Sequence, residues 1–215
     1  MAKVEDVLAV YERPYDPKRP VVCADESNKE LHKTPRGILP AETGQVARQD
    51  YEYERNSTAN MFMTVEPLVG KRRVRVTDRR TKQDFAELLR CLSDDDYPEA
   101  DIIVLVTDNL NTHSPACLYE RFEPAEARRL AERFEWHYTP EHGSWLNMAE
   151  IELSVLSRQC LARRISDKEI LSAEVSAWES SRNNVKVQID WQFRTVDARI
   201  KLKRLYPILK QQYSD

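Results

Sequence analysis

Hydrophobic residues in this chain fall into short runs and two-residue alternations, separated by stretches with helical spacing. The run at 21–24 follows Pro20 and ends at Asp25, which is typical of a buried strand. Residues 59–66 and 72–77 alternate with period two on either side of a turn, which predicts a β-hairpin. The predicted strands are residues 21–24, 59–66, 72–77, 102–106 and 134–138.

Helical spacing dominates most of the remaining sequence. Thr81 is a predicted N-cap with Asp84 three residues later, and apolar side chains recur at helical intervals after it. The predicted helices are residues 4–11, 81–92, 124–134, 145–161, 167–182 and 195–206. Residues 28–56 are polar and contain prolines and glycines, so we expect a loop there. The resulting order, β-β-β-α-β-α-β-α with a helical tail, predicts an α/β fold whose mixed sheet is flanked by helices.

This order predicts one main domain with two appendages. Residues 1–19 are expected to form a short helix and a proline-rich linker, residues 20–165 the α/β domain, and residues 166–215 a helical extension packed on it. A chain of 215 residues is long enough for one sizeable core.

Composition excludes several classes of protein. The 33 basic and 36 acidic residues give a net charge of −3, which excludes a uniformly basic nucleic-acid coat but not a local basic face. The longest apolar run has five residues, whereas a membrane span needs roughly 20. The four glycines form no phosphate-cradling loop. The four cysteines are widely spaced, so we expect reduced thiols in a cytoplasmic protein.

Acidic residues stand at suggestive positions. Asp25 ends the first predicted strand and Asp108 ends the most hydrophobic one. Ligand sites gather beyond the carboxyl ends of strands in open α/β sheets, so these carboxylates would face each other if the two strands are neighbours. A divalent cation removes the repulsion between them, and oxygen ligands favour Mg²⁺ or Mn²⁺.

Glu150 is the third candidate ligand, expected in the second turn of the helix at 145–161. Three acids from two strands and one helix can hold two metal ions roughly 3.5–4 Å apart, a pair that activates a hydroxyl and stabilises the leaving oxygen of a phosphodiester. The plainer alternative is that all three are turn residues, helix caps or surface acids.

Three segments resemble the transposases of bacterial insertion sequences in the Tc/mariner superfamily. They are residues 21–27 (VVCADES), 104–113 (VLVTDNLNTH) and 137–150 (HYTPEHGSWLNMAE). The resemblance implies a ribonuclease-H-like fold in which Asp25, Asp108 and Glu150 form an Asp-Asp-Glu metal triad. It also implies Mg²⁺-dependent cleavage of transposon ends and attack of the freed 3′-hydroxyl on double-stranded target DNA, with a homodimer in the DNA complex and a nucleoid-associated location.

Further residues are expected to support this chemistry. Asn109 and His113 follow the second acid and Asn147 precedes the third by one turn, so each could orient a ligand or reach a phosphate. DNA contacts are expected from the basic cluster at 71–82 and from one histidine beside the third motif. The candidate DNA-binding residues are Arg72, Arg73, Arg75 and His142.

The chain also departs from this family. Full-length members carry helix-turn-helix modules ahead of the catalytic domain, and Met1 lies just before the catalytic region, so we expect a second reading frame, a truncated copy or an excised domain. The main alternative function is a non-catalytic remnant that binds DNA or a partner transposase. A phosphatase with an aspartate nucleophile ranks last, because it usually needs a second Asp two residues after the first, and Ser27 stands there.

Overall fold

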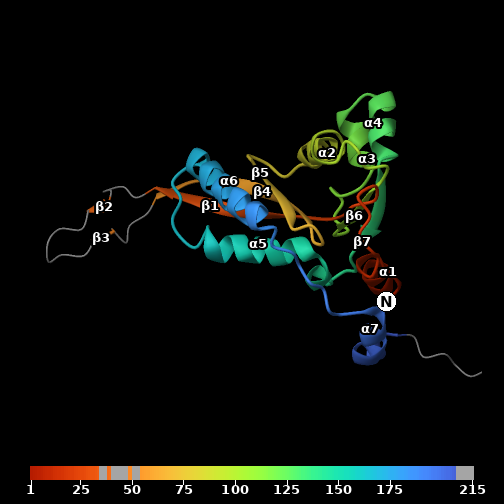
Figure 1. Ribbon diagram of the computed structural model, residues 1–215. Coiled ribbons are helices and arrows are strands. Elements are labelled where there is room, and N and C mark those ends of the chain that lie inside the picture. The colour runs from red at the N-terminus through yellow and green to blue at the C-terminus, as the bar shows by residue number, and fades with distance from the viewer. Residues whose placement is uncertain (34–37, 40–47, 50–53, 207–215) are drawn as a thin grey trace, which may run out of the picture.

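A mixed five-stranded sheet forms the centre of the molecule (Figure 1). The computed structural model describes residues 1–33, 38–39, 48–49 and 54–206. The strands are β1 Val21–Lys33, β4 Glu54–Glu66, β5 Lys71–Thr77, β6 Ile103–Thr107 and β7 Phe134–Tyr138, with a small second sheet of β2 Ile38–Leu39 and β3 Arg48–Gln49. The order across the main sheet is β5-β4-β1-β6-β7. The β1–β4 and β4–β5 pairs are antiparallel, whereas β6 and β7 continue the sheet in parallel with β1.

Seven α-helices accompany the sheet within the described residues. They are α1 Ala2–Tyr11, α2 Lys82–Cys91, α3 Ala116–Arg121, α4 Pro124–Ala131, α5 Met148–Gln159, α6 Lys168–Val185 and α7 Thr195–Lys201. The predicted cap of α2 is confirmed, because Thr81 and Asp84 form a reciprocal capping box. In this part of the chain no helix is both long enough and apolar enough to cross a membrane.

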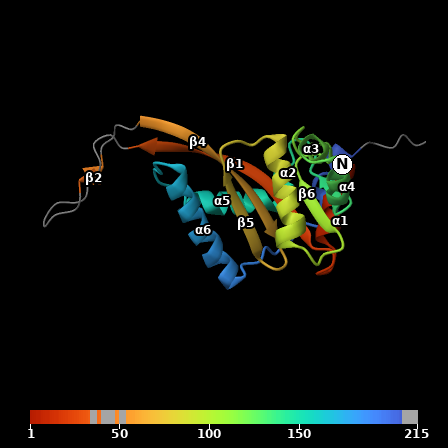
Figure 2. The same ribbon diagram turned by 90° about the horizontal axis from the view of Figure 1, so that it is seen from above.

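The sheet separates two hydrophobic cores. Alternate residues of β6 face opposite sides: Val104 and Val106 join the core with α1, α5, α6 and α7, and Ile103 and Leu105 join the core with α2, α3 and α4. Figure 1 shows α5 along one side of β1 and β4 with α2, α3 and α4 on the other side, and Figure 2 shows β1 and β4 extending away from the α2–α4 end. The molecule is therefore a three-layer α/β/α arrangement.

The first strand is longer than its hydrophobic run predicts. It continues past Asp25 to Lys33 and pairs with β4 along its length, so Asp25 lies within a strand instead of ending it. Polar residues are accommodated because backbone hydrogen bonds to β4 continue along this segment, in which Leu31 is also buried in the core. Residues 28–33 and 54–56 of the predicted loop are thus strand, 38–39 and 48–49 form the small sheet, and the rest of that loop lies outside the described residues.

The predicted helix at 145–161 is divided. A 3₁₀ turn spans Ser144–Leu146, and α5 begins after Asn147, whose side chain accepts a hydrogen bond from the Ala149 backbone N–H at 3.1 Å. Glu150 therefore lies in the first turn of α5, where a carboxylate faces the positive end of the helix dipole, and the predicted second-turn position was wrong.

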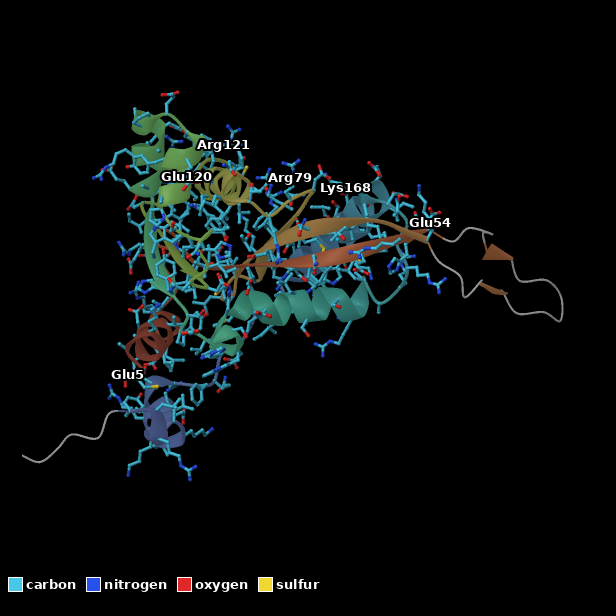
Figure 3. All side chains as sticks on the ribbon, turned by 180° about the vertical axis from the view of Figure 1, so that it is seen from behind. Glu5, Glu54, Arg79, Glu120, Arg121 and Lys168 are labelled. Carbon is cyan, nitrogen blue, oxygen red and sulfur yellow. The ribbon has the colours of Figure 1, made fainter. Side chains whose placement is uncertain are left out.

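The first and last described helices pack against each other. Figure 3 labels Glu5 on α1, close to α7, and its carboxylate accepts hydrogen bonds of 2.9 Å from Arg199 and 2.7 Å from the Tyr206 hydroxyl. On its other side α1 buries Val7 and Leu8 completely. The division of the chain at residues 19 and 165 stays a prediction.

Candidate active site

Asp25 occupies a fixed position in the middle of the sheet. Its side chain leaves β1 toward α5, and the residue is only 9% exposed. One carboxylate oxygen accepts the backbone N–H of Glu26 at 2.8 Å, and the other accepts the Asn147 side-chain amide at 3.0 Å. The carboxylate is thus aimed by a backbone group on one side and by the first residue of α5 on the other.

Asn147 connects the central strand to the helix that carries the third acid. It is completely buried, and its amide nitrogen also donates to the Ala24 carbonyl at 2.9 Å, while its oxygen caps α5. A buried amide with this many partners is held in one orientation. Asn147 therefore sets the position of α5, and with it Glu150, relative to Asp25.

Asp108 follows β6, the strand next to β1. The two strands run parallel with Val106 opposite Cys23, so this register places Asp108 beside Asp25. Asp108 accepts hydrogen bonds from the imidazole of His113 and, at 3.3 Å, from the backbone N–H of Leu110. Its side chain is 30% exposed, so solvent and ligands can reach the carboxylate.

Glu150 and Asp108 line a common cleft. Its volume is about 400 Å³, and its wall also contains Asn109, His142 and the segment 139–144. Asp25 does not line this cleft, but it lies close enough to both acids for their charges to act on it. The three predicted acids therefore lie in one region of the molecule, together with Asn109 and Asn147.

The electrostatics of Asp25 reflect this crowding. Burial raises the pKa of Asp25 to about 7, the backbone N–H of Glu26 opposes the rise, and the charges of Glu150, Glu26 and Asp108 add to it. Among the residues that the structure describes, no Lys, Arg or His lies within ion-pair distance of the Asp25 carboxylate. Burial and neighbouring negative charges disfavour the ionised form of Asp25, and a bound cation would stabilise that form.

His113 is the cationic member of this neighbourhood. Burial lowers its pKa, but contacts with the Asp108 and Glu26 carboxylates outweigh that effect and raise the pKa of His113 to about 9. The ring is 1% exposed and packs on Phe85 with 4.2 Å between ring centroids. His113 is therefore a buried imidazolium at neutral pH that contacts one of the three acids.

The donor chemistry suits a hard divalent ion, because all three acids offer carboxylate oxygens. Within the described residues, however, no three His, Cys, Asp or Glu side chains are close enough together to hold one ion. The carboxylate of Asp108 contacts His113, and Glu150 is exposed in the cleft. The negative charges of the three acids thus favour a cation, but their carboxylates do not converge on one ion position.

Arg72 is not a DNA-binding residue, and this prediction was wrong. Its side chain is completely buried and forms an ion pair of 2.9 Å with Glu152 of α5. Two further guanidinium nitrogens donate to the carbonyls of Gly70 and Val187, at 2.9 and 2.6 Å. The alternation along β5 contained this signal, because position 72 shares the inward face with Val74.

The other predicted DNA-binding residues lie at the surface or near it. Arg73 is 47% exposed and pairs with Asp96, while Arg75 is half-buried and its guanidinium contacts Cys91. His142 is fully exposed at a positive φ of 59° and lines the cleft beside Asp108 and Glu150. Contact of these three residues with DNA stays a prediction.

Lys3 is a cleft residue that the sequence does not reveal. It extends from α1 into the wall of the same cleft, and its ammonium lies 5.9 Å from the centre of the Tyr138 ring. In the described part of the chain it forms no ion pair with an acid. Lys3 is separated from Asp108 by more than a hundred positions, and no local pattern links the two.

The raised pKa of Asp25 predicts a pH-dependent stability. An ordinary aspartate ionises near pH 3.8 and Asp25 in the folded chain near 7, so the folded state loses stability relative to the unfolded state as pH rises between these values, by as much as about 4 kcal/mol. We expect Asp25→Asn to abolish this loss in metal-free protein. In denaturant unfolding with EDTA, the free energy of unfolding of the variant should rise relative to that of the wild type between pH 4 and 7 and should not rise further above pH 7. A difference between the two proteins that does not change with pH would contradict the prediction.

A sheet of this order, with acids on the central strand β1, directly after its neighbour β6 and on helix α5, defines a ribonuclease-H-like domain. Residues 20–172 match the family model described as DDE superfamily endonuclease, and this match covers more than half of the chain. The chain belongs to the DDE superfamily endonuclease family.

The first of two similar solved structures supports the same fold. The crystal structure of the Mos1 strand transfer complex contains a chain that matches with a TM-score of 0.60 and 13% sequence identity, over 86% of this chain and 54% of the Mos1 chain. A cryo-electron microscopy structure of a simian T-cell lymphotropic virus intasome with the PP2A regulatory subunit B56 gamma matches with a TM-score of 0.45 and 13% identity, over 94% and 61% of the two chains. The chain thus spans about half the length of the Mos1 chain. No curated protein matches it in sequence.

Proposed function

We propose that this chain is the catalytic domain of a DNA transposase that cleaves the ends of an insertion sequence and transfers the freed strand to target DNA. The observation that carries the proposal is that Asp108 and Glu150 line one cleft, with Asp25 near enough for both charges to act on it, in a chain of the DDE superfamily endonuclease family. Similarity to Mos1 supports the fold of the domain.

The three acids are the proposed metal ligands, for two Mg²⁺ or Mn²⁺ ions. When bound, such a pair polarises the scissile phosphodiester and lowers the pKa of an attacking hydroxyl. The chain itself positions the ligands: Asn147 holds Asp25, and His113 contacts Asp108. Asn109, on the cleft wall, is proposed to orient the neighbouring ligand or a phosphate.

Double-stranded DNA is the proposed substrate. His142 and Lys3 line the cleft and are placed to contact a phosphate beside the acids, while Arg73 and Arg75 are proposed to contact the backbone farther away. A homodimer is proposed for the DNA complex. Recognition of specific ends is not part of this proposal, because the chain spans about half of the Mos1 chain.

Nicking of supercoiled plasmid and thermal melting test the proposal together. We expect relaxed circles to accumulate only with Mg²⁺ or Mn²⁺. A metal ion bound by the native state should also raise the melting temperature. At a metal concentration of 100 times the dissociation constant, the free energy of unfolding should increase by about 2.7 kcal/mol. A chain that binds plasmid, does not nick it and does not respond to metal would instead be the non-catalytic DNA-binding remnant.

A further inference from the structure

Glu26 is an acid that no part of the proposed reaction uses, although it is the neighbour of Asp25. Adjacent residues of a strand point to opposite faces of the sheet. Asp25 faces α5, where Asn147 contacts it, and Glu26 faces the core that contains Phe85 of α2. The Glu26 side chain is only 6% exposed, so its carboxylate needs a partner inside the protein.

That partner is His113. One carboxylate oxygen of Glu26 lies 3.0 Å from Nε2 of His113, the distance of an ion pair, although the angle falls short of a regular hydrogen bond. The other ring nitrogen, Nδ1, contacts the carboxylate of Asp108. A chain of three side chains therefore runs from β1 to the acid that follows β6.

The imidazole has little freedom to move. The hydroxyl of Thr107 lies 3.3 Å from Nδ1, and the ring of Phe85 covers one face of the imidazole at 4.2 Å between centroids. With its two nitrogens between two carboxylates, the ring cannot turn without breaking both contacts. The location of Nδ1, and hence of the Asp108 carboxylate, depends on what holds Nε2.

We propose that Glu26 is a positioning residue for Asp108, acting through His113 across the sheet. Asp25 is positioned from one face by Asn147, and Asp108 is positioned from the opposite face by Glu26. This inference rests on the proposed function only in naming Asp108 as a metal ligand. The contact between Glu26 and His113 belongs to the metal-free chain.

Variants of Glu26 that differ in length and in charge show whether the residue acts by positioning His113 or only by its negative charge. Glu26→Gln keeps an acceptor oxygen at the same distance, whereas Glu26→Asp keeps the charge but is one methylene too short to contact Nε2. Outer residues that orient a metal ligand contribute about 10–100-fold to metal affinity. We expect Glu26→Asp to weaken Mn²⁺ binding by this factor and Glu26→Gln to weaken it less. Glu30→Gln, farther along the same strand and 49% exposed, is the matched control and should bind like the wild type.

Two measurements on the full chain test the proposal. Calorimetric titration with Mn²⁺ gives the affinities, and nitrogen NMR of the histidine rings in metal-free protein, assigned with His113→Gln, shows whether Nε2 of His113 responds. The expected result is a shifted Nε2 signal and weaker Mn²⁺ binding in Glu26→Asp. An unchanged His113 ring, wild-type affinity in Glu26→Asp, or weaker binding in Glu26→Gln than in Glu26→Asp would overturn it. A wild type that binds no Mn²⁺ would refute the proposed function instead, and the ring signals would still decide the contact.

Discussion

Replacement of Asp25, Asp108 or Glu150 by its amide is expected to lower DNA strand cleavage by about a thousandfold or more. Each amide keeps the shape of the side chain but removes the charge that would hold a metal ion at the cleft. The loss of about 4 kcal/mol of transition-state stabilisation corresponds to this factor. Initial rates of plasmid nicking at saturating Mg²⁺ measure it.

Glu120→Gln is the matched control for these variants. Glu120 is an exposed acid on α3 that pairs with Lys82 at the surface (Figure 3). Its amide should nick plasmid at the wild-type rate. Melting temperatures of the variants separate lost chemistry from lost folding. Wild-type nicking by a folded Asp108→Asn or Glu150→Gln chain would remove that residue from the catalytic machinery.

The second large effect is expected at Glu152, two positions after Glu150 on the same helix. Glu152 is 2% exposed at its side chain and pairs at 2.9 Å with both Arg72 and Arg182. Glu152→Gln leaves the Arg72 guanidinium, which is completely buried, without a carboxylate partner. Breaking a buried ion pair in this way costs about 3–5 kcal/mol, which lowers the melting temperature of a chain this size by roughly 6–20 °C.

Glu150→Gln provides the contrast to this variant. Its side chain is exposed in the cleft, so the same substitution should change the free energy of unfolding by less than about 1 kcal/mol. Thermal or denaturant unfolding of the two variants in EDTA makes the comparison. If the two variants unfold alike, the network of Glu152 with the two arginines contributes little to stability.

The sequence predicts the sheet well where side chains decide the structure. Alternation locates the β4–β5 hairpin, and the apolar run locates β6, which is buried along its whole length. It fails where the backbone decides: β1 continues through residues 26–33 because it pairs with β4, and polar side chains there carry no signal of that pairing. The helix at 145 is divided for a similar reason, since one buried amide at Asn147 outweighs the helical spacing around it.

The candidate site was likewise predictable where local sequence patterns carry the information and unpredictable where tertiary contacts decide. Asp25 and Asp108 are predicted to be neighbours from the assumption that β1 and β6 are adjacent, and the parallel pairing of Cys23 with Val106 confirms that assumption. The sequence wrongly predicts an exposed Arg72 because a cluster of basic residues is typical of a protein surface, and its partner Glu152 comes eighty positions later. Lys3 has no local pattern, because only tertiary packing brings it to the cleft. Glu26 follows Asp25 in the sequence, but its contact with His113 comes from tertiary packing.

The contact between α1 and α7 has a practical consequence for protein engineering. Glu5 links α1 to Arg199 and Tyr206, and Lys3 on the same helix lines the cleft. A version trimmed to residues 20–172 would discard α1, and with it the Lys3 side of the cleft. Shortened or fused versions should therefore retain both terminal helices as a matched pair.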